Sequence, residues 1–127
     1  MRVTLISMLT VTFLAVGICI LSLSVIGQVT SEADDARMEV MDLIEAGETG
    51  KAHMRLKQMA EAWGGHEEML AILAPHDALH RITELIIEGS ANLEAGDLDD
   101  FNRSMALLGE AIHHLHEEER LSVANVL

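Results

Sequence analysis

Apolar and polar residues are distributed unevenly along the chain, and the first segment stands apart from the rest. From Val3 to Ile26 the sequence holds twenty-four residues without a charge, proline, asparagine or glutamine. A helix rises about 1.5 Å per residue, so this run would measure about 36 Å, against a bilayer hydrocarbon core of about 30 Å. Its scattered serines and threonines can donate to carbonyls of their own helix. The run therefore predicts a transmembrane helix.

Two other structures for this run stay open. A very apolar helix in the core of a soluble protein would pass the same length test. A cleaved signal peptide has an apolar region of about 7–15 residues, which is shorter than this run, although Ser22-Leu23-Ser24 resembles a cleavage site. Cys19 follows Ile18, where a lipoprotein signal has a small residue. As the only cysteine of the chain, Cys19 predicts no internal disulfide.

Beyond residue 30 the apolar residues recur at spacings of three and four, which is the period of an amphipathic helix. No stretch alternates apolar and polar residues as a half-buried strand would. Glycines or a proline separate the stripes, since glycine favours helix ends and the residue before a proline leaves the helical region. The predicted stripes are Ala33–Ile44, Ala52–Trp63, Leu79–Leu93 and Leu98–Leu115, with a short helix His66–Leu73 between Gly64-Gly65 and Pro75.

These elements predict an all-α fold, with an N-terminal transmembrane helix followed by a small antiparallel helical hairpin or bundle. We divide the chain into an anchor, residues 1–30, and a helical domain, residues 31–127. No proline or glycine lies between Gly27 and Ile44. We therefore expect one long helix that runs from the anchor into the helical domain.

The helical domain is strongly acidic. It holds all 21 Asp and Glu and seven of the eight Lys and Arg, because Arg2 belongs to the anchor, and its net charge is −14 with neutral histidines. Such a field repels the phosphates of nucleic acid and of anionic lipid, which excludes nucleic-acid binding. Arg2 precedes the apolar run, whereas acids follow it with Arg37 as the nearby cation. By the positive-inside rule we expect the N-terminus in the cytoplasm and residues 31–127 outside.

Several features of the chain together resemble a known family. A short apolar anchor leads into an acidic helical segment with Trp63 at mid-chain, His76 opens the next helix, and the chain closes on ERLSVANVL at 119–127. This arrangement resembles a bacterial family of small single-span membrane proteins catalogued as a domain of unknown function, number four-three-six-three. The resemblance implies an accessory role beside another protein of the cell membrane, and no activity is known for the family. Gly64-Gly65 departs from the family's pattern and implies a bend.

The histidines are the side chains best suited to binding a metal ion. His76 and His80 are four residues apart and share a helix face. An antiparallel hairpin about Gly96 brings His76 level with His116, and His80 level with Ile112 or His113. Pairs of ligands on neighbouring helices are how bundles build metal sites, and imidazole suits zinc, copper, nickel or iron. The spacing thus predicts a metal site formed by His76, His80, His113 and His116, with Asp77 and Glu117 as further ligands or their supports.

Two other interpretations of the histidines stay open. Histidine near a helix C-terminus is favoured by the helix dipole, so HHLHEEER at 113–120 is also typical of a solvated helix end. A histidine cluster that titrates at about pH 6 could instead alter the packing.

The sequence favours a non-enzymatic function. It carries no serine or cysteine nucleophile with a positioned base and no glycine-rich phosphate loop, and it predicts no cofactor other than a transition metal. The main hypothesis is a membrane-anchored extracytoplasmic interaction module that acts beside another membrane protein. The alternative is a metal-binding or pH-sensing ectodomain that uses the histidine cluster, and a third is the ligand-sensing outer part of a receptor.

Overall fold

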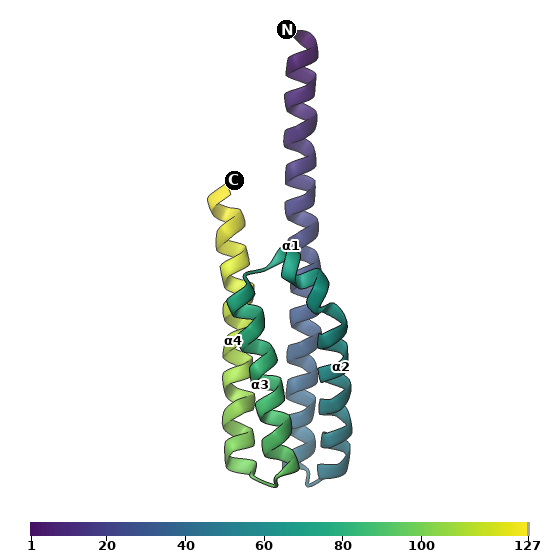
Figure 1. Cartoon of the computed structure of the whole chain (residues 1–127), viewed down its shortest axis with the longest axis vertical. Helices are drawn as coiled ribbons and strands as arrows, with labels where there is room; N and C mark the ends of the chain where they lie inside the picture. Colours follow the sequence, from purple (N-terminus) through teal and green to yellow (C-terminus); the bar gives the residue numbers. More distant parts are fainter. Residues whose placement is uncertain (127) are drawn as a thin grey trace.

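Four helices account for nearly the whole chain. The structure is a computed structural model that describes residues 1–126, leaving aside the side chains at 119, 122, 123, 125 and 126. The helices are α1 (Arg2–Glu45), α2 (Thr49–Leu73), α3 (His76–Glu94) and α4 (Leu98–Val126), and residues 1–126 contain no strand. Successive helices run in opposite directions, and each packs against the next, with α4 closing the ring against α1 (Figure 1). The prediction of an all-α fold with an antiparallel bundle is confirmed.

The helix α1 belongs only in part to this bundle. Its first half projects beyond the other helices, and its second half packs against α2 and α4 (Figure 1). We call the end of the bundle where α1 enters the entry end; it also holds the α2–α3 connection. The opposite end, which holds the α1–α2 and α3–α4 connections, is the turn end. The helix runs without a break through residues 27–33, as predicted.

The two connections at the turn end have the same geometry. Gly47 and Gly96 have φ of 78° and 77°, a left-handed conformation that glycine adopts without a steric penalty. The N–H of Glu48 donates to the carbonyl of Leu43 over 2.9 Å, and that of Asp97 donates to the carbonyl of Asn92 over 3.0 Å. These bonds satisfy carbonyls at the helix end in the Schellman pattern. The repeated sequence Glu-Ala-Gly followed by an acid thus forms two equivalent turns.

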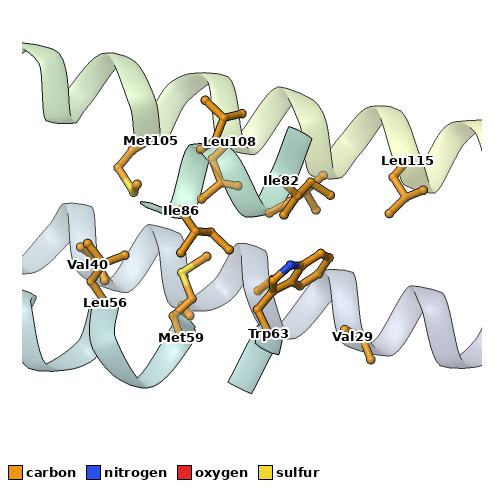
Figure 2. Packing of buried hydrophobic residues seen from close by; sticks show 14 of the residues in the cluster. Val29, Val40, Leu56, Met59, Trp63, Ile82, Ile86, Met105, Leu108 and Leu115 are labelled. Carbon is orange, nitrogen blue, oxygen red and sulfur yellow. The ribbon is translucent and has the colours of Figure 1, made fainter. Parts of the chain in front are cut away.

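One continuous core joins the four helices. Leu56 and Met59 of α2, Ile82 and Ile86 of α3, and Met105 of α4 are all at most 2 % exposed, and Figure 2 shows side chains of this kind meeting between the helices. The predicted apolar stripes supply most of this core. Leu98 is an exception at 43 % exposed, because it is the first residue of α4 and lies at the outer edge of the turn end. The core begins at Ile26, which is 1 % exposed, so the bundle starts where the apolar run ends.

The predicted break at Gly64-Gly65, and with it a separate helix over 66–73, is wrong. The helix α2 continues through both glycines to Leu73 and ends before Pro75, where Ala74 is extended with φ −129° and ψ 159°. Each glycine in a helix interior costs about 1 kcal/mol relative to alanine. Trp63 and Leu70 are seven residues apart on one face of α2, and both are buried. Their packing offsets the cost of the glycines and keeps the helix intact.

Candidate functional site

The first half of α1 is the most unusual surface of the molecule. Its apolar run is long enough to cross a membrane, and only 6 % of its most apolar stretch is buried. The hydroxyls of Thr10 and Thr12 donate to the carbonyls of Ile6 and Met8 over 2.7 and 2.8 Å, so these polar groups are satisfied inside the helix. The large exposed side chains are Val3, Leu5, Ile6, Met8, Leu9, Val11, Phe13, Leu14, Ile18, Ile20 and Leu21.

The histidines gather at the entry end, beside the point where this apolar half leaves the bundle. Six of the seven lie there, and only His53 lies towards the turn end, beside Gly50 and Glu94. They do not share one surface. The grooves between neighbouring helices divide them into separate sets.

His113 and His116 line the groove between α1 and α4, which has a volume of about 420 Å³. Small residues of both helices, Gly27, Ser31 and Gly109, form part of its wall. The ring of His116 lies close to Gly27, where an added Cβ would be 3.7 Å from its Cε1. The groove therefore follows α1 up to the start of the projecting half.

His76 and His80 line a different groove, between α2 and α3, together with Glu67 and Thr83. Their rings are stacked, with centroids 6.4 Å apart and planes inclined by 12°. Sequence reasoning placed these two histidines on one face, and the structure does bring them together. It does not bring them to His113 and His116.

Rotation about the helix axes explains this separation. Counting residues from the turn predicts which residues of two paired helices lie at the same height. The direction in which each side chain points depends instead on the rotation of its helix about the helix axis. His114 is the histidine of α4 that lies in the α3–α4 groove, opposite Asp77 and Arg81. A single metal ion would require all four side chains to line the same groove, and they line two: His113 and His116 one, His76 and His80 the other. Among the described side chains, no group of three or more His, Cys, Asp or Glu is placed to hold a metal ion.

Three of the exposed histidines instead have a glutamate one turn further along their helix. Nε2 of His80 lies 3.2 Å from Oε1 of Glu84, and Nε2 of His113 lies 3.4 Å from Oε1 of Glu117. The His114 ring makes the corresponding contact with the next glutamate at 3.2 Å. The three histidine side chains are 66–73 % exposed. Pairs of this kind are screened by water and contribute little to stability. Glu117, predicted as a further metal ligand or support, is the partner of His113.

Arg37 fastens α1 to α4 beside the groove. Its side chain is 16 % exposed and its Nε donates to Oδ1 of Asp34 over 2.8 Å. Its Nη1 donates to the main-chain carbonyl of Met105 over 3.4 Å. The guanidinium lies so close to Gly109 that an added Cβ would be 2.7 Å from its Cζ. Glycine at 109 is thus what lets an arginine of α1 reach the backbone of α4.

A polar network between α2 and α3 was not predicted from the sequence. Nε1 of Trp63 donates to Oγ1 of Thr83 over 3.0 Å, and that hydroxyl lies 2.8 Å from Oε1 of Glu67 and 3.1 Å from the carbonyl of Leu79. Trp63 itself is 3 % exposed, so the last residue of the predicted stripe Ala52–Trp63 lies in the core. A buried indole N–H requires an acceptor, but only the pairing of α2 with α3 identifies Thr83.

The comparison with known families places the chain in one of them. Residues 20–126 match the family described as Domain of unknown function (DUF4363), and the chain belongs to it. The match includes the end of the apolar run and the whole bundle. No curated protein and no solved structure matches the chain.

Proposed function

We propose that this chain is a single-pass membrane protein whose helical domain stands outside the cytoplasm and serves as an accessory module beside another membrane protein. Residues 1–30 are the anchor, and residues 31–127 meet the partner. The proposed role is non-enzymatic, because the sequence carries no motif that pairs a serine or cysteine nucleophile with a positioned base.

The observation that supports membrane anchoring is the exposed apolar half of α1. Soluble proteins rarely expose contiguous apolar surface beyond a few hundred Å², yet the large side chains from Val3 to Leu21 are mostly exposed. A bilayer would remove this surface from water, and a helix satisfies its own main-chain groups there. Arg2 before the run and the acids after it favour the orientation with the bundle outside.

The rigid junction supports a partner in the same membrane. Because α1 passes from the anchor into the core without a break, the bundle is held directly at the membrane surface. A domain held in this way meets what lies in or on the same membrane. We place the contact at the α1–α4 groove, because its volume of about 420 Å³ and the small, exposed side chain of Ser31 leave room there for the close approach of a helix. The occupant would be a helix of the partner that emerges from the bilayer alongside α1.

Co-purification with matched variants tests this proposal. The tagged full-length protein is prepared from its native membrane after a carbonate wash, solubilised in gentle detergent, and its associated proteins are quantified by mass spectrometry. Ser31→Trp fills the groove at an exposed position, and Glu88→Trp puts the same side chain on an exposed position of α3.

We expect a stoichiometric membrane protein with the wild type and with Glu88→Trp, and a loss of about tenfold or more with Ser31→Trp. Release of the protein by carbonate, or a mature mass that lacks the apolar run, would contradict anchoring. A protein that purifies alone, or a partner retained equally by both variants, would contradict the contact at the groove.

A further inference from the structure

The helix α4 continues well past the end of the core. Its last described buried side chain is Leu115, and beyond it the described side chains, among them Glu117, Leu121 and Ala124, are exposed. Figure 1 shows this end of α4 extending beyond the α2–α3 connection, in the direction in which the first half of α1 projects. The described side chains of α4 beyond Leu115 therefore take no part in the bundle core.

The register between α1 and α4 fixes how far this end reaches. The His116 ring packs at Gly27, and Arg37 of α1 bonds the carbonyl of Met105. Both contacts describe the same antiparallel alignment. Since both helices rise about 1.5 Å per residue, each step along α4 is level with one step back along α1. Residues 117–120 are then level with residues 23–26, and residues 121–126 are level with residues 17–22.

The apolar run indicates where these levels lie relative to the layers of a bilayer. A helix needs about 20 residues to cross the hydrocarbon core, so a span that starts at Val3 reaches the outer boundary at about Ser22. Residues 23–26 then occupy the headgroup layer. The charges of α4 match this division, because Glu117, Glu118 and Arg120 fall at the headgroup level and the segment LSVANVL at 121–127 has no charged side chain.

We propose that residues 121–126 of α4 lie in the outer face of the lipid bilayer, at the boundary between headgroups and hydrocarbon, as a second contact of the protein with the membrane. The inference rests on the proposed anchoring by α1. Leu121 is 64 % exposed, and a lipid environment removes it from water. The lipids that suit this contact have zwitterionic headgroups, because Glu117 and Glu118 at headgroup level repel anionic lipids.

A second contact has a mechanical consequence. One span alone leaves the bundle free to tilt and to turn about the axis of α1. A second helix end set in the same bilayer restricts both motions. The α1–α4 groove is then presented in a fixed direction along the membrane surface.

Spin-label accessibility in a bilayer tests the proposal. In a Cys19→Ala background, a nitroxide is attached to the full-length protein at Ala124→Cys. Two reference variants are Ala106→Cys, exposed on α4 within the bundle, and Ala15→Cys, exposed on the projecting half of α1. Each protein is reconstituted in phosphatidylcholine vesicles, and collisions with oxygen, which concentrates in lipid, are compared with collisions with a water-soluble nickel chelate.

At position 124 we expect oxygen to be favoured as at position 15, with nickel collisions at least threefold rarer than at position 106. If position 124 meets nickel as often as position 106 while position 15 is protected, the end of α4 is in water and the inference is wrong, although the anchor stands. If position 124 is protected from both reagents, a second copy of the chain covers it instead of lipid, and the inference is wrong. Nickel access at position 15 would overturn the anchor as well.

Discussion

The same substitution, glycine to alanine, is predicted to have opposite effects at two positions of this bundle. Gly64 lies in the middle of α2, and an added Cβ there would meet no atom within 4 Å. Gly89 lies in the middle of α3 and is buried, and an added Cβ would collide with Cε of Met105 and contact Cβ of Ser104 at 3.7 Å. Met105 is fully buried, so its methyl group has no solvent to move into.

The magnitudes follow from two opposing terms. Alanine in place of glycine in a helix interior is favourable by about 1 kcal/mol, and Gly64→Ala should gain that amount in full. At Gly89 the same gain is opposed by overpacking of about 1–3 kcal/mol. The net effect of Gly89→Ala is then a loss of about 0–2 kcal/mol, and the two variants should differ by about 1–3 kcal/mol.

Urea titration of the full-length protein in detergent micelles measures this difference. Trp63 is the only tryptophan and is 3 % exposed, so its fluorescence reports on unfolding of the bundle and not on the anchor. In a Met105→Ala background, which itself costs about 2–5 kcal/mol, the collision is gone and Gly89→Ala should become stabilising by about 1 kcal/mol. A Gly89→Ala variant as stable as Gly64→Ala, or one that shows no coupling to Met105→Ala, would refute this reasoning.

Three further predictions concern core and surface. Phe101 is fully buried, so Phe101→Ala should lower the free energy of unfolding in the same urea titration by about 3–5 kcal/mol; a loss below 1 kcal/mol would contradict its place in the core. Thr83→Val leaves Nε1–H of Trp63 without its acceptor and should cost about 1–3 kcal/mol, whereas an unchanged urea midpoint would show that the network is not formed. A hydrogen bond with Asp97 and the charge of Asp97 raise the pKa of the Asp100 carboxyl above its usual value. Because the folded-state pKa is the higher one, the stability that proton binding adds is present at acidic pH and is lost as pH rises through that pKa. Asp97→Ala should lower the carbon-13 titration midpoint of Asp100, and an unmoved midpoint would contradict this cause.

Much of the fold follows from local sequence, because its helices are delimited by residues with strong local preferences. The Glu-Ala-Gly sequences at 45–47 and 94–96 each end a helix, since glycine takes the left-handed conformation that both turns require. Pro75 ends α2 because it forces Ala74 into an extended conformation. The prediction of a helix break at Gly64-Gly65 is wrong for a physical reason. A mid-helix glycine is a small local penalty, and the burial of Trp63 outweighs it.

The arrangement of the histidines could not be predicted in the same way. Counting residues about Gly96 places His76 level with His116, but it leaves the rotation of each helix undetermined. That rotation depends on which face of α4 meets α1 and which meets α3, and hence on packing over the whole core. His113 and His116 turn towards α1, whereas His114 turns towards α3. The contact of Trp63 with Thr83 is hidden from the sequence for the same reason.

The direct junction between apolar run and core limits what a partner can be. Ile26 is already in the core, and α1 ends at Glu45, so with about 1.5 Å per residue the turn end stands about 30 Å beyond the end of the apolar run. A flexible linker would let such a domain search a wider volume, but α1 supplies none between residues 26 and 45. If the anchor spans the bilayer as proposed, any partner must contact the bundle within about 30 Å of the membrane surface. That geometry favours a neighbouring membrane protein over a soluble one. It also makes the entry end, where α1, α4 and the histidines meet, the part of the bundle that lies nearest to the membrane-spanning part of such a neighbour.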